Sequence, residues 1–303
     1  MRARAAAWRA GLSPSATGHL AMLAFAAVVA GSFSLGATIA NDIDPAALTA
    51  VRFAIALGVV AGLAAAQGGW RRAALAAPWR YLVLGCLYGG YFVLMFEGLK
   101  TAPPVSAAAV FTLVPAMTAL FGWAILGQVP TARLAGALAI GGAGALWVIF
   151  RGDPAALVAF AVGRGEAIYF VGCIAHAVLT PLMRRLNRGE PAVSFTALML
   201  VAGVIVVSAA GAPALVATDW GTLPARVWWV TAYLAIFASA TSFVLLQVAA
   251  MRLPAAKVMA YTYLVPSFVI GWEVGLGNGA PAGVVAVGVA LTALAVVLLL
   301  KDD

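Results

Sequence analysis

The chain has 303 residues, of which 64% are apolar or aromatic and only 9% are charged. A soluble domain carries roughly 25% charged residues, so this composition excludes a water-soluble globular protein. Each transmembrane helix needs about 20 mostly apolar residues, and ten such helices with short loops would use the whole length. The net charge of +8 is spread over the predicted loops and ends, so we interpret it as a topology signal and expect no nucleic-acid partner.

Ten apolar runs between polar breaks predict an all-α membrane protein with ten transmembrane helices. Prolines open four of the runs, namely Pro45, Pro103, Pro191 and Pro281. Proline suits a first helical turn, whose N–H groups lack partners within the helix. The predicted segments cover residues 19–40, 45–66, 79–97, 103–127, 131–149, 165–183, 191–212, 228–250, 255–276 and 281–300.

The first 18 residues are predicted to form a basic cytoplasmic tail, in which Arg2, Arg4 and Arg9 precede the first apolar run. A secretory signal peptide has the same order of charge and apolar run, but its apolar core usually has about 7–15 residues. The run that follows this tail is longer. We therefore expect a retained first helix.

The basic residues predict the orientation of the chain. With a cytoplasmic amino terminus, 13 of the 18 Lys and Arg residues fall on the cytoplasmic side, four on the outer side and one, Arg52, within a helix. The positive-inside rule therefore places both termini in the cytoplasm of a multi-pass protein, which we expect in the inner (plasma) membrane. The predicted cytoplasmic set is Arg2, Arg4, Arg9, Arg71, Arg72, Arg80, Arg133, Arg184, Arg185, Arg188, Arg252, Lys257 and Lys301, and the outer set is Lys100, Arg151, Arg164 and Arg226.

The two halves of the chain are similar to each other. A shift of 151 residues pairs Pro103 with Pro254 and Pro115 with Pro266, and nine of the 39 positions between residues 92 and 130 are identical in the two copies. Each half would hold five helices. Because five is odd, the second half must enter the membrane upside down, which is an architecture of transporters.

The segment from Asp44 to Phe53, which reads Asp-Pro-Ala-Ala-Leu-Thr-Ala-Val-Arg-Phe, resembles the second-helix motif of the EamA type of the drug/metabolite transporter superfamily. The Val-Pro pairs of the fourth and ninth helices and the glycine-rich fifth helix are similar to that family as well. The resemblance implies two EamA-like repeats, over residues 19–150 and 165–300. It also implies a secondary transporter that exports small amphipathic metabolites by alternating access, as a monomer or a homodimer.

Two short segments of the chain differ from the family pattern, and a third segment resembles one branch of the family. Family members often carry Leu-Gly-Glu after the fourth and ninth helices, where this chain has Leu126-Gly127-Gln128 and Leu276-Gly277-Asn278. A role for that glutamate therefore does not carry over. Residues 261–266 (Tyr-Thr-Tyr-Leu-Val-Pro) resemble the bacterial aromatic amino acid exporters, which implies neutral or aromatic amino acids as substrates. Other metabolites or drugs are the alternative.

Counting along each predicted helix at about 1.5 Å per residue places a set of polar and aromatic residues near the bilayer midplane. Hydroxyl and imidazole groups are costly in hydrocarbon, so we expect them to face the interior. Together they predict a central cavity that binds an amphipathic solute by stacking and hydrogen bonds, although each tyrosine alone also fits ordinary packing between helices. The predicted cavity residues are Ser32, Tyr88, Tyr91, Phe111, Thr112, His176, Ser239, Ser242 and Tyr263.

Pro115 and Pro266 lie near the middle of their predicted helices, where each removes one backbone hydrogen bond. We interpret them as a pair of hinges beside the substrate pathway, and kinks satisfied by neighbouring helices are the alternative. We predict that His176 is the only histidine within a helix. It fits a proton relay, a group that orients a substrate carboxylate, or a simple hydrogen bond between helices.

Three glutamates, Glu97, Glu166 and Glu273, fall near the outer ends of their predicted helices. They predict an acidic outer mouth, and solvation at the interface is the alternative. Arg52 lies deeper and needs a partner, for which Asp42, Asp44 and a neighbouring carboxylate are the candidates. We interpret Arg52 as structural.

Other classes of protein lack their sequence signals. No phosphate-binding Gly-x-x-x-x-Gly-Lys-Ser/Thr motif, His-Glu-x-x-His motif or Gly-x-Ser-x-Gly motif occurs, which argues against a direct use of ATP and against an intramembrane enzyme. A channel would need a ring of filter groups. The two cysteines, Cys86 and Cys173, lie in apolar stretches and are predicted core residues, and we expect neither a metal site nor a cofactor.

Overall fold

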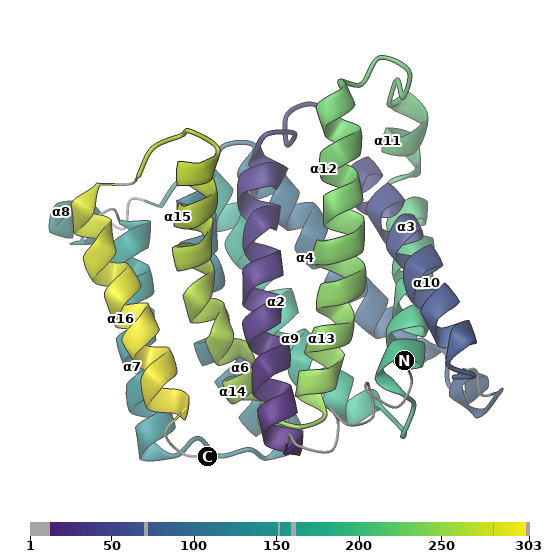
Figure 1. The fold of residues 1–303 in the computed structure, drawn as a ribbon, viewed down its shortest axis with the longest axis horizontal. Helices are drawn as coiled ribbons and strands as arrows, with labels where there is room; N and C mark the ends of the chain where they lie inside the picture. The colour runs from purple at the N-terminus through teal and green to yellow at the C-terminus, as the bar shows by residue number, and fades with distance from the viewer. Residues whose placement is uncertain (1–12, 70–71, 151, 159–161, 281, 301–303) are drawn as a thin grey trace, which may run out of the picture.

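The computed structural model describes residues 13–69, 72–150, 152–158, 162–280 and 282–300, and these residues form helices and no strand. The long helices stand side by side in one bundle (Figure 1). Most of the predicted basic tail, with Arg2, Arg4 and Arg9, lies outside the described residues, as do Arg71, Arg151, Pro281 and Lys301.

The described residues of the first half form six α-helices and one 3-10 helix. These are α2 (Pro14–Ala37), α3 (Pro45–Ala66), η1 (Arg72–Ala76), α4 (Trp79–Leu99), α5 (Pro104–Phe111), α6 (Val114–Leu126) and α7 (Ala132–Ile149). The second half follows the short helix α8 (Pro154–Val158). It consists of α9 (Arg164–Leu186), α10 (Ala192–Ala210), α11 (Ala212–Ala217), α12 (Ala225–Ala235), η2 (Ile236–Thr241), α13 (Ser242–Ala250), α14 (Ala255–Ala260), η3 (Tyr261–Leu264), α15 (Val265–Gly275) and α16 (Gly283–Leu300).

Side-chain caps and prolines explain where several helices begin. Asp44 accepts hydrogen bonds from the N–H groups of Ala46 and Ala47, and Pro45 follows as the first residue of α3, as a capped helix start requires. Ser13 caps α2 in the same way. Helix α2 consequently begins five residues before the predicted start, and His19 lies inside it, so the statement that His176 is the only helical histidine is wrong.

Eight helices of the described residues are long and apolar enough to cross a membrane. They include Pro104–Leu126, which combines α5 and α6, and Ala225–Ala250, which combines α12, η2 and α13. Helix α16 is a shorter apolar helix over Gly283–Leu298. The predicted segment 255–276 is divided into α14, η3 and α15. Ten crossings therefore stay a prediction.

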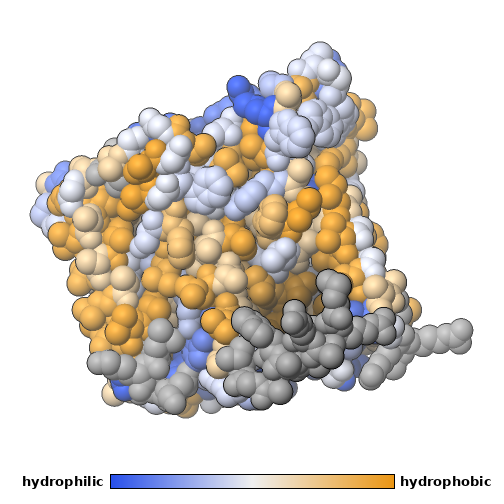
Figure 2. Space-filling model, in the orientation of Figure 1, coloured by the Kyte–Doolittle hydropathy of each residue, from blue (hydrophilic) through white to orange (hydrophobic). Residues whose placement is uncertain are grey.

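The face of the bundle drawn in Figure 2 is apolar across its middle. Figure 2 shows a broad hydrophobic band between more hydrophilic rims. Trp79 and Trp229 are exposed near opposite ends of the bundle, as in the aromatic belts of membrane proteins. Cys173 is buried as predicted, whereas Cys86 is exposed on α4, so its assignment to the core is wrong.

The two halves run in opposite directions. The amide of Asn41, just after α2, donates to the carbonyl of Lys100 at the end of α4 (3.4 Å). A Cβ on Gly98 near that end would lie 2.6 Å from the carbonyl oxygen of Gly165 at the start of α9. The first helix of the second half thus begins at the end of the bundle where α2 finishes. The start of α2 and the end of α16 both lie at the opposite end of the bundle (Figure 1).

Several helix pairs pack closely in the bundle. Helix α7 packs along α16, and a Cβ on Gly144 would lie 2.6 Å from the Gly288 carbonyl oxygen. Helix α4 packs along both α9 and α10, with Gly85 against the backbone of Gly203. Small residues of this kind let membrane helices approach closely where lipid offers no hydrophobic driving force.

Candidate functional site

The centre of the bundle holds a cluster of buried aromatic rings around His176 of α9. The imidazole stacks on Tyr91 of α4, with 4.5 Å between ring centroids and 25° between planes, and on Tyr88 at 5.6 Å and 26°. Phe111, the last residue of α5, lies 5.3 Å away. The consecutive helices α4 and α5 and the distant helix α9 therefore bring four of the predicted cavity residues together.

The cluster lies where the two repeats meet. Phe92 of α4 and Phe243 of α13 are equivalent under the shift of 151 residues, and their rings stack with centroids 5.7 Å apart. The Tyr88 ring stacks on Phe243 at 3.9 Å. Equivalent residues of inverted repeats approach each other near the axis that relates the repeats, and substrate sites of such transporters lie there.

Sequence reasoning missed Tyr169, which extends the cluster along α9. Its hydroxyl shares a hydrogen bond with that of Tyr91 (2.9 Å), and Phe33 of α2 packs edge-on against its ring at 5.9 Å. The sequence did contain a signal for Tyr169. This residue precedes His176 by seven residues, or two helical turns, and this spacing puts both side chains on the same face of α9.

Arg52 of α3 is fully buried beside this cluster and has no carboxylate partner among the described residues. Its Nε and Nη2 donate to Ser239 Oγ at 3.0 and 2.8 Å, and Nη2 also donates to the carbonyls of Leu234 and Ala238. The expected pairing with Asp42 or Asp44 is wrong, because Asp42 binds Arg226 and Asp44 caps α3.

The carbonyl acceptors for Arg52 come from an irregular turn. Helix α12 continues into the π-helical turn η2, where the i to i−4 ladder is interrupted. The carbonyl of Leu234, in the last turn of α12 just before η2, accepts hydrogen bonds from Ser239 Oγ and Arg52 Nη2. The ring of Phe92 covers the guanidinium, 4.1 Å from its carbon to the ring centroid. These contacts hold Arg52 in one orientation.

Several buried polar atoms near the cluster have no hydrogen-bond partner among the described residues. They include both ring nitrogens of His176 and Nη1 of Arg52. The side-chain amide of Gln247 on α13 and the hydroxyls of Ser32 and Thr180 share this condition. Buried polar groups are nearly always paired in proteins, so this concentration of unpaired groups marks a place that a polar ligand or water can occupy.

Both predicted hinge prolines follow a break in a helix. Helix α5 ends at Phe111 and α6 begins at Val114, with Pro115 in its first turn. In the second repeat α14 gives way to the 3-10 turn η3 before α15 starts at Val265, with Pro266 in its first turn. Broken helices in the interior are typical of transporter binding sites. The hinge motion stays a prediction.

The remaining predicted cavity residues differ in where they point. Ser239 donates to Leu234 and Ser242 to Ala238, within their own helix, and Thr112 donates to Ala109. Tyr263 does not join the cluster, since its hydroxyl donates to the Leu138 carbonyl (3.2 Å) on α7. Its ring instead packs against α7, in a separate apolar cluster with α14 and α16.

The three predicted outer-mouth glutamates lie at the same end of the bundle but are held differently. Glu97 is partly exposed and pairs with Lys100 at 2.6 Å. Glu166, in the first turn of α9, is buried. Glu273 of α15 is also buried, and its Oε2 accepts from the amide of Asn278 (2.9 Å) while Oε1 has no partner among the described residues.

A pocket of about 590 Å³ opens at the opposite end, and its lining includes Arg184, Arg252 and Lys257. Thr180 lies one turn after His176 and one turn before Arg184, so these three residues share one face of α9. The polar face runs from the central cluster toward the pocket. Gln128, at the position of the missing family glutamate, also lines the pocket and accepts the Ala255 N–H at 3.0 Å.

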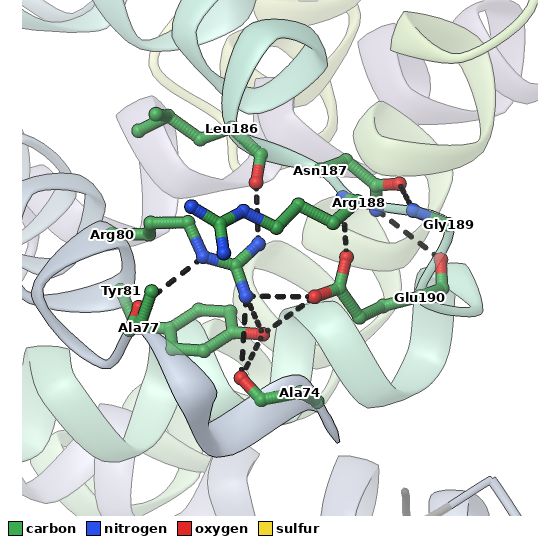
Figure 3. Close-up of polar contacts among 9 residues, drawn as sticks. All are labelled: Ala74, Ala77, Arg80, Tyr81, Leu186, Asn187, Arg188, Gly189 and Glu190. Atoms are coloured by element: carbon green, nitrogen blue, oxygen red, sulfur yellow. Dashed lines mark hydrogen bonds and ion pairs between the residues drawn. The ribbon is translucent and has the colours of Figure 1, made fainter.

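A buried ion pair joins the two repeats at this same end (Figure 3). Arg80, at the start of α4, donates to Glu190 in the connection between α9 and α10 (2.8 Å). Tyr81 donates to the same carboxylate oxygen, and the Arg188 N–H donates to the other. Burial acts to raise the pKa of Glu190, but the hydrogen bonds from Arg80 and the backbone outweigh it and hold this pKa below its ordinary value.

Inverted repeats, interior helix breaks and unpaired polar groups at the repeat interface define a helical membrane transporter. The EamA-like transporter family matches the chain twice, over residues 16–150 and 163–301. The chain therefore belongs to the EamA-like transporter family, within the drug/metabolite transporter superfamily.

The proteins that are similar to this chain include the following two. One is the protein described as "Uncharacterized transporter YyaM" from Bacillus subtilis (strain 168), with 25% identity over 291 residues, which are 93% of this chain and 95% of that protein. The other is a solved structure described only as a crystal structure of a protein. It superposes with a TM-score of 0.71 at 21% identity, over 95% of this chain and 98% of the other, and it shares the fold.

Proposed function

We propose that this protein is a secondary transporter of the inner membrane that exports small amphipathic metabolites, with neutral and aromatic amino acids as the principal substrates. The observation that carries the proposal is the imidazole of His176, which lies between the rings of Tyr88, Tyr91 and Phe111 with both nitrogens unpartnered among the described residues. The rings accept a flat apolar side chain by stacking. The imidazole nitrogens, one donor and one acceptor when neutral, bind polar groups of the same molecule.

The composition of the cluster supports an uncharged or zwitterionic substrate. Its walls are aromatic rings and one imidazole, and Arg52 is the charged side chain beside them. Aromatic amino acids combine a ring with two opposite charges that sum to zero. A polyanion or a polycation would leave charges uncompensated in this interior. Burying each such charge costs on the order of several kcal/mol.

The breaks before Pro115 and Pro266 support alternating access. A broken helix can tilt one half against the other without losing further backbone hydrogen bonds. Both breaks occupy equivalent positions in the two inverted repeats. Equivalent tilting of the two repeats opens the cluster first to one side of the membrane and then to the other.

The distribution of charge supports a cytoplasmic location of both termini. Arg80, Arg184 and Lys257 lie at one end of the bundle, and Lys100 and Arg226 at the other. The positive-inside rule assigns the first end to the cytoplasm. Substrate then enters through the pocket lined by Arg184 and leaves past the end that carries Glu166 and Glu273.

Counterflow in proteoliposomes tests the proposed function. Vesicles that contain the purified protein are loaded with unlabelled solute and supplied with the labelled solute outside, over a panel of amino acids, other metabolites and amphipathic drugs. We expect saturable, trans-stimulated exchange of phenylalanine and other neutral amino acids. Exchange of another metabolite or a drug with no amino acid exchange would refute the substrate class, and flux without trans-stimulation would indicate a channel.

A further inference from the structure

Arg52 is a buried cation whose acceptors are all neutral. Its side chain is fully buried, and its hydrogen bonds go to the hydroxyl of Ser239 and the carbonyls of Leu234 and Ala238. Among the described residues no carboxylate lies within ion-pairing distance of it. A membrane interior disfavours such an uncompensated charge, and ionisable residues retained there mark functional sites.

One nitrogen of the guanidinium is left for a ligand. Nε and Nη2 are occupied, whereas Nη1 has no hydrogen-bond partner among the described residues. Arginine stays charged in proteins, so the site keeps both a positive charge and a free donor. Ser239 and the π-helical turn η2 fix the planar group from one edge, which leaves the opposite edge to meet an anion.

The surroundings of Arg52 join this donor to the aromatic cluster. Phe92 covers the guanidinium at 4.1 Å, the Tyr88 ring lies 5.4 Å from Phe92, and His176 lies 5.6 Å from Tyr88. An anion at Arg52 therefore has stacked rings beside it. A monocarboxylate with an attached apolar body fits this arrangement.

We propose that Arg52 binds the carboxylate of the transported substrate through Nη1, while the apolar part of the substrate stacks among Phe92, Tyr88 and His176. This proposal rests on the proposed function and makes Arg52 a specificity residue. With one free nitrogen, Arg52 satisfies a monocarboxylate by one charge-assisted hydrogen bond. Dicarboxylates and phosphate esters would bring a second negative charge that no described residue beside the cluster neutralises.

The test compares ligands that differ in one group. The probes are phenylalanine, phenylalaninamide, which lacks the carboxylate, and 3-phenylpropanoate, which lacks the ammonium. Each is measured as a competitor of labelled phenylalanine in counterflow and by thermal stabilisation of the purified protein in detergent. The variants are Arg52→Lys, Arg52→Gln and, as a matched control, Arg185→Gln, which removes an exposed arginine in the last turn of α9.

We expect the wild-type protein and Arg185→Gln to prefer phenylalanine over phenylalaninamide by at least about tenfold, which corresponds to about 1.4 kcal/mol. Arg52→Lys should keep the preference with a raised half-saturation concentration, and Arg52→Gln should lose it. An unchanged preference in Arg52→Gln overturns the proposal. If Arg52→Gln does not fold, the wild-type protein still decides, because equal affinity for phenylalanine and its amide also overturns it.

The ligand panel separates this proposal from the proposed function. If no amino acid is exchanged but 3-phenylpropanoate stabilises the wild-type protein and not Arg52→Gln, the amino acid assignment fails and the carboxylate site stands. If phenylalanine and its amide are exchanged equally, the carboxylate site fails and the transport function stands. If none of the three probes is exchanged or stabilises the protein, both fail.

Discussion

The rings of Phe92 and Phe243 occupy equivalent positions in the two repeats and stack on each other at 5.7 Å between centroids. Their contact locates the interface between the repeats at the centre of the aromatic cluster. Tyr88 and Ser239 are also equivalent, yet Tyr88 stacks on His176 and Ser239 binds Arg52. At this pair of positions the two repeats have thus diverged into one aromatic and one polar residue, an asymmetry that suits the amphipathic substrate that we propose.

Replacement of His176 by phenylalanine should separate stability from transport. The ring keeps its stacking partners Tyr88 and Tyr91, while two nitrogens without partners disappear. A buried unsatisfied polar group costs about 1–3 kcal/mol, so His176→Phe should unfold at the wild-type temperature or higher. Because substrate loses its polar contact, the half-saturation concentration for exchange should rise about tenfold. A wild-type half-saturation concentration would show that the imidazole does not contact the substrate.

Depth along the helices could be predicted from the sequence, but the direction of each side chain could not. Counting residues along the helices placed Tyr88, Tyr91, Phe111 and His176 at one depth in the membrane, and their side chains meet in the structure. Tyr263 lies at an equivalent level but points toward α7, because its direction depends on how the broken helix turns at η3. Hydropathy also located the apolar segments. The limits of an apolar segment, like the depth of a residue in the membrane, depend only on position along one helix.

The partner of Arg52 could not be predicted because it depends on a backbone irregularity. The sequence offered Asp42 and Asp44 as nearby carboxylates. The actual acceptors are Ser239, the carbonyl of Ala238 in the turn η2 and the carbonyl of Leu234 just before it, nearly two hundred positions later in the chain. No local pattern in the segment 236–241 marks a π-helical turn, and its acceptors become visible only in the folded bundle.

Replacement of Pro266 by alanine should impair transport more than expression. Alanine restores an N–H that can bond the Thr262 carbonyl, so the α-helix can extend through the turn η3. A continuous helix resists tilting, and we expect the rate of exchange to fall about tenfold, which is about 1.4 kcal/mol in the barrier. Pro154→Ala, at the start of the exposed helix α8, is the matched control. Exchange kinetics unchanged by Pro266→Ala would remove the hinge role.

Glu190 should make the stability of the protein depend on acid. Its pKa in the folded protein lies below the ordinary value, so the ionised carboxylate stabilises the fold above about pH 4.3, the ordinary value for glutamate. That stabilisation is lost as the pH falls through the lower folded value. Melting temperature in detergent, measured from pH 7 to pH 3, should fall for the wild-type protein at the acidic end.

Glu190→Gln should remove the acid-dependent part of that decrease and lower the melting temperature at pH 7. Loss of one partner from the buried pair leaves Arg80 less compensated, which typically costs about 3–5 kcal/mol, less here because glutamine still accepts hydrogen bonds. Asp42→Asn removes the exposed pair with Arg226 and should change stability by less than about 1 kcal/mol. Equal effects of the two substitutions would contradict a structural role for the buried pair.

Gly144 and Gly142 on α7 give a matched test of the close contact between α7 and α16. A Cβ on Gly144 would lie 2.6 Å from the Gly288 carbonyl oxygen and 2.9 Å from Leu291 Cβ, whereas a Cβ on Gly142 would meet open space. Gly144→Ala forces two backbones apart and should destabilise the protein by about 1–3 kcal/mol. Gly142→Ala should instead stabilise the helix by about 0.5–1 kcal/mol. Thermal unfolding in detergent separates the two, and equal melting temperatures would mean that α7 and α16 are not held this closely.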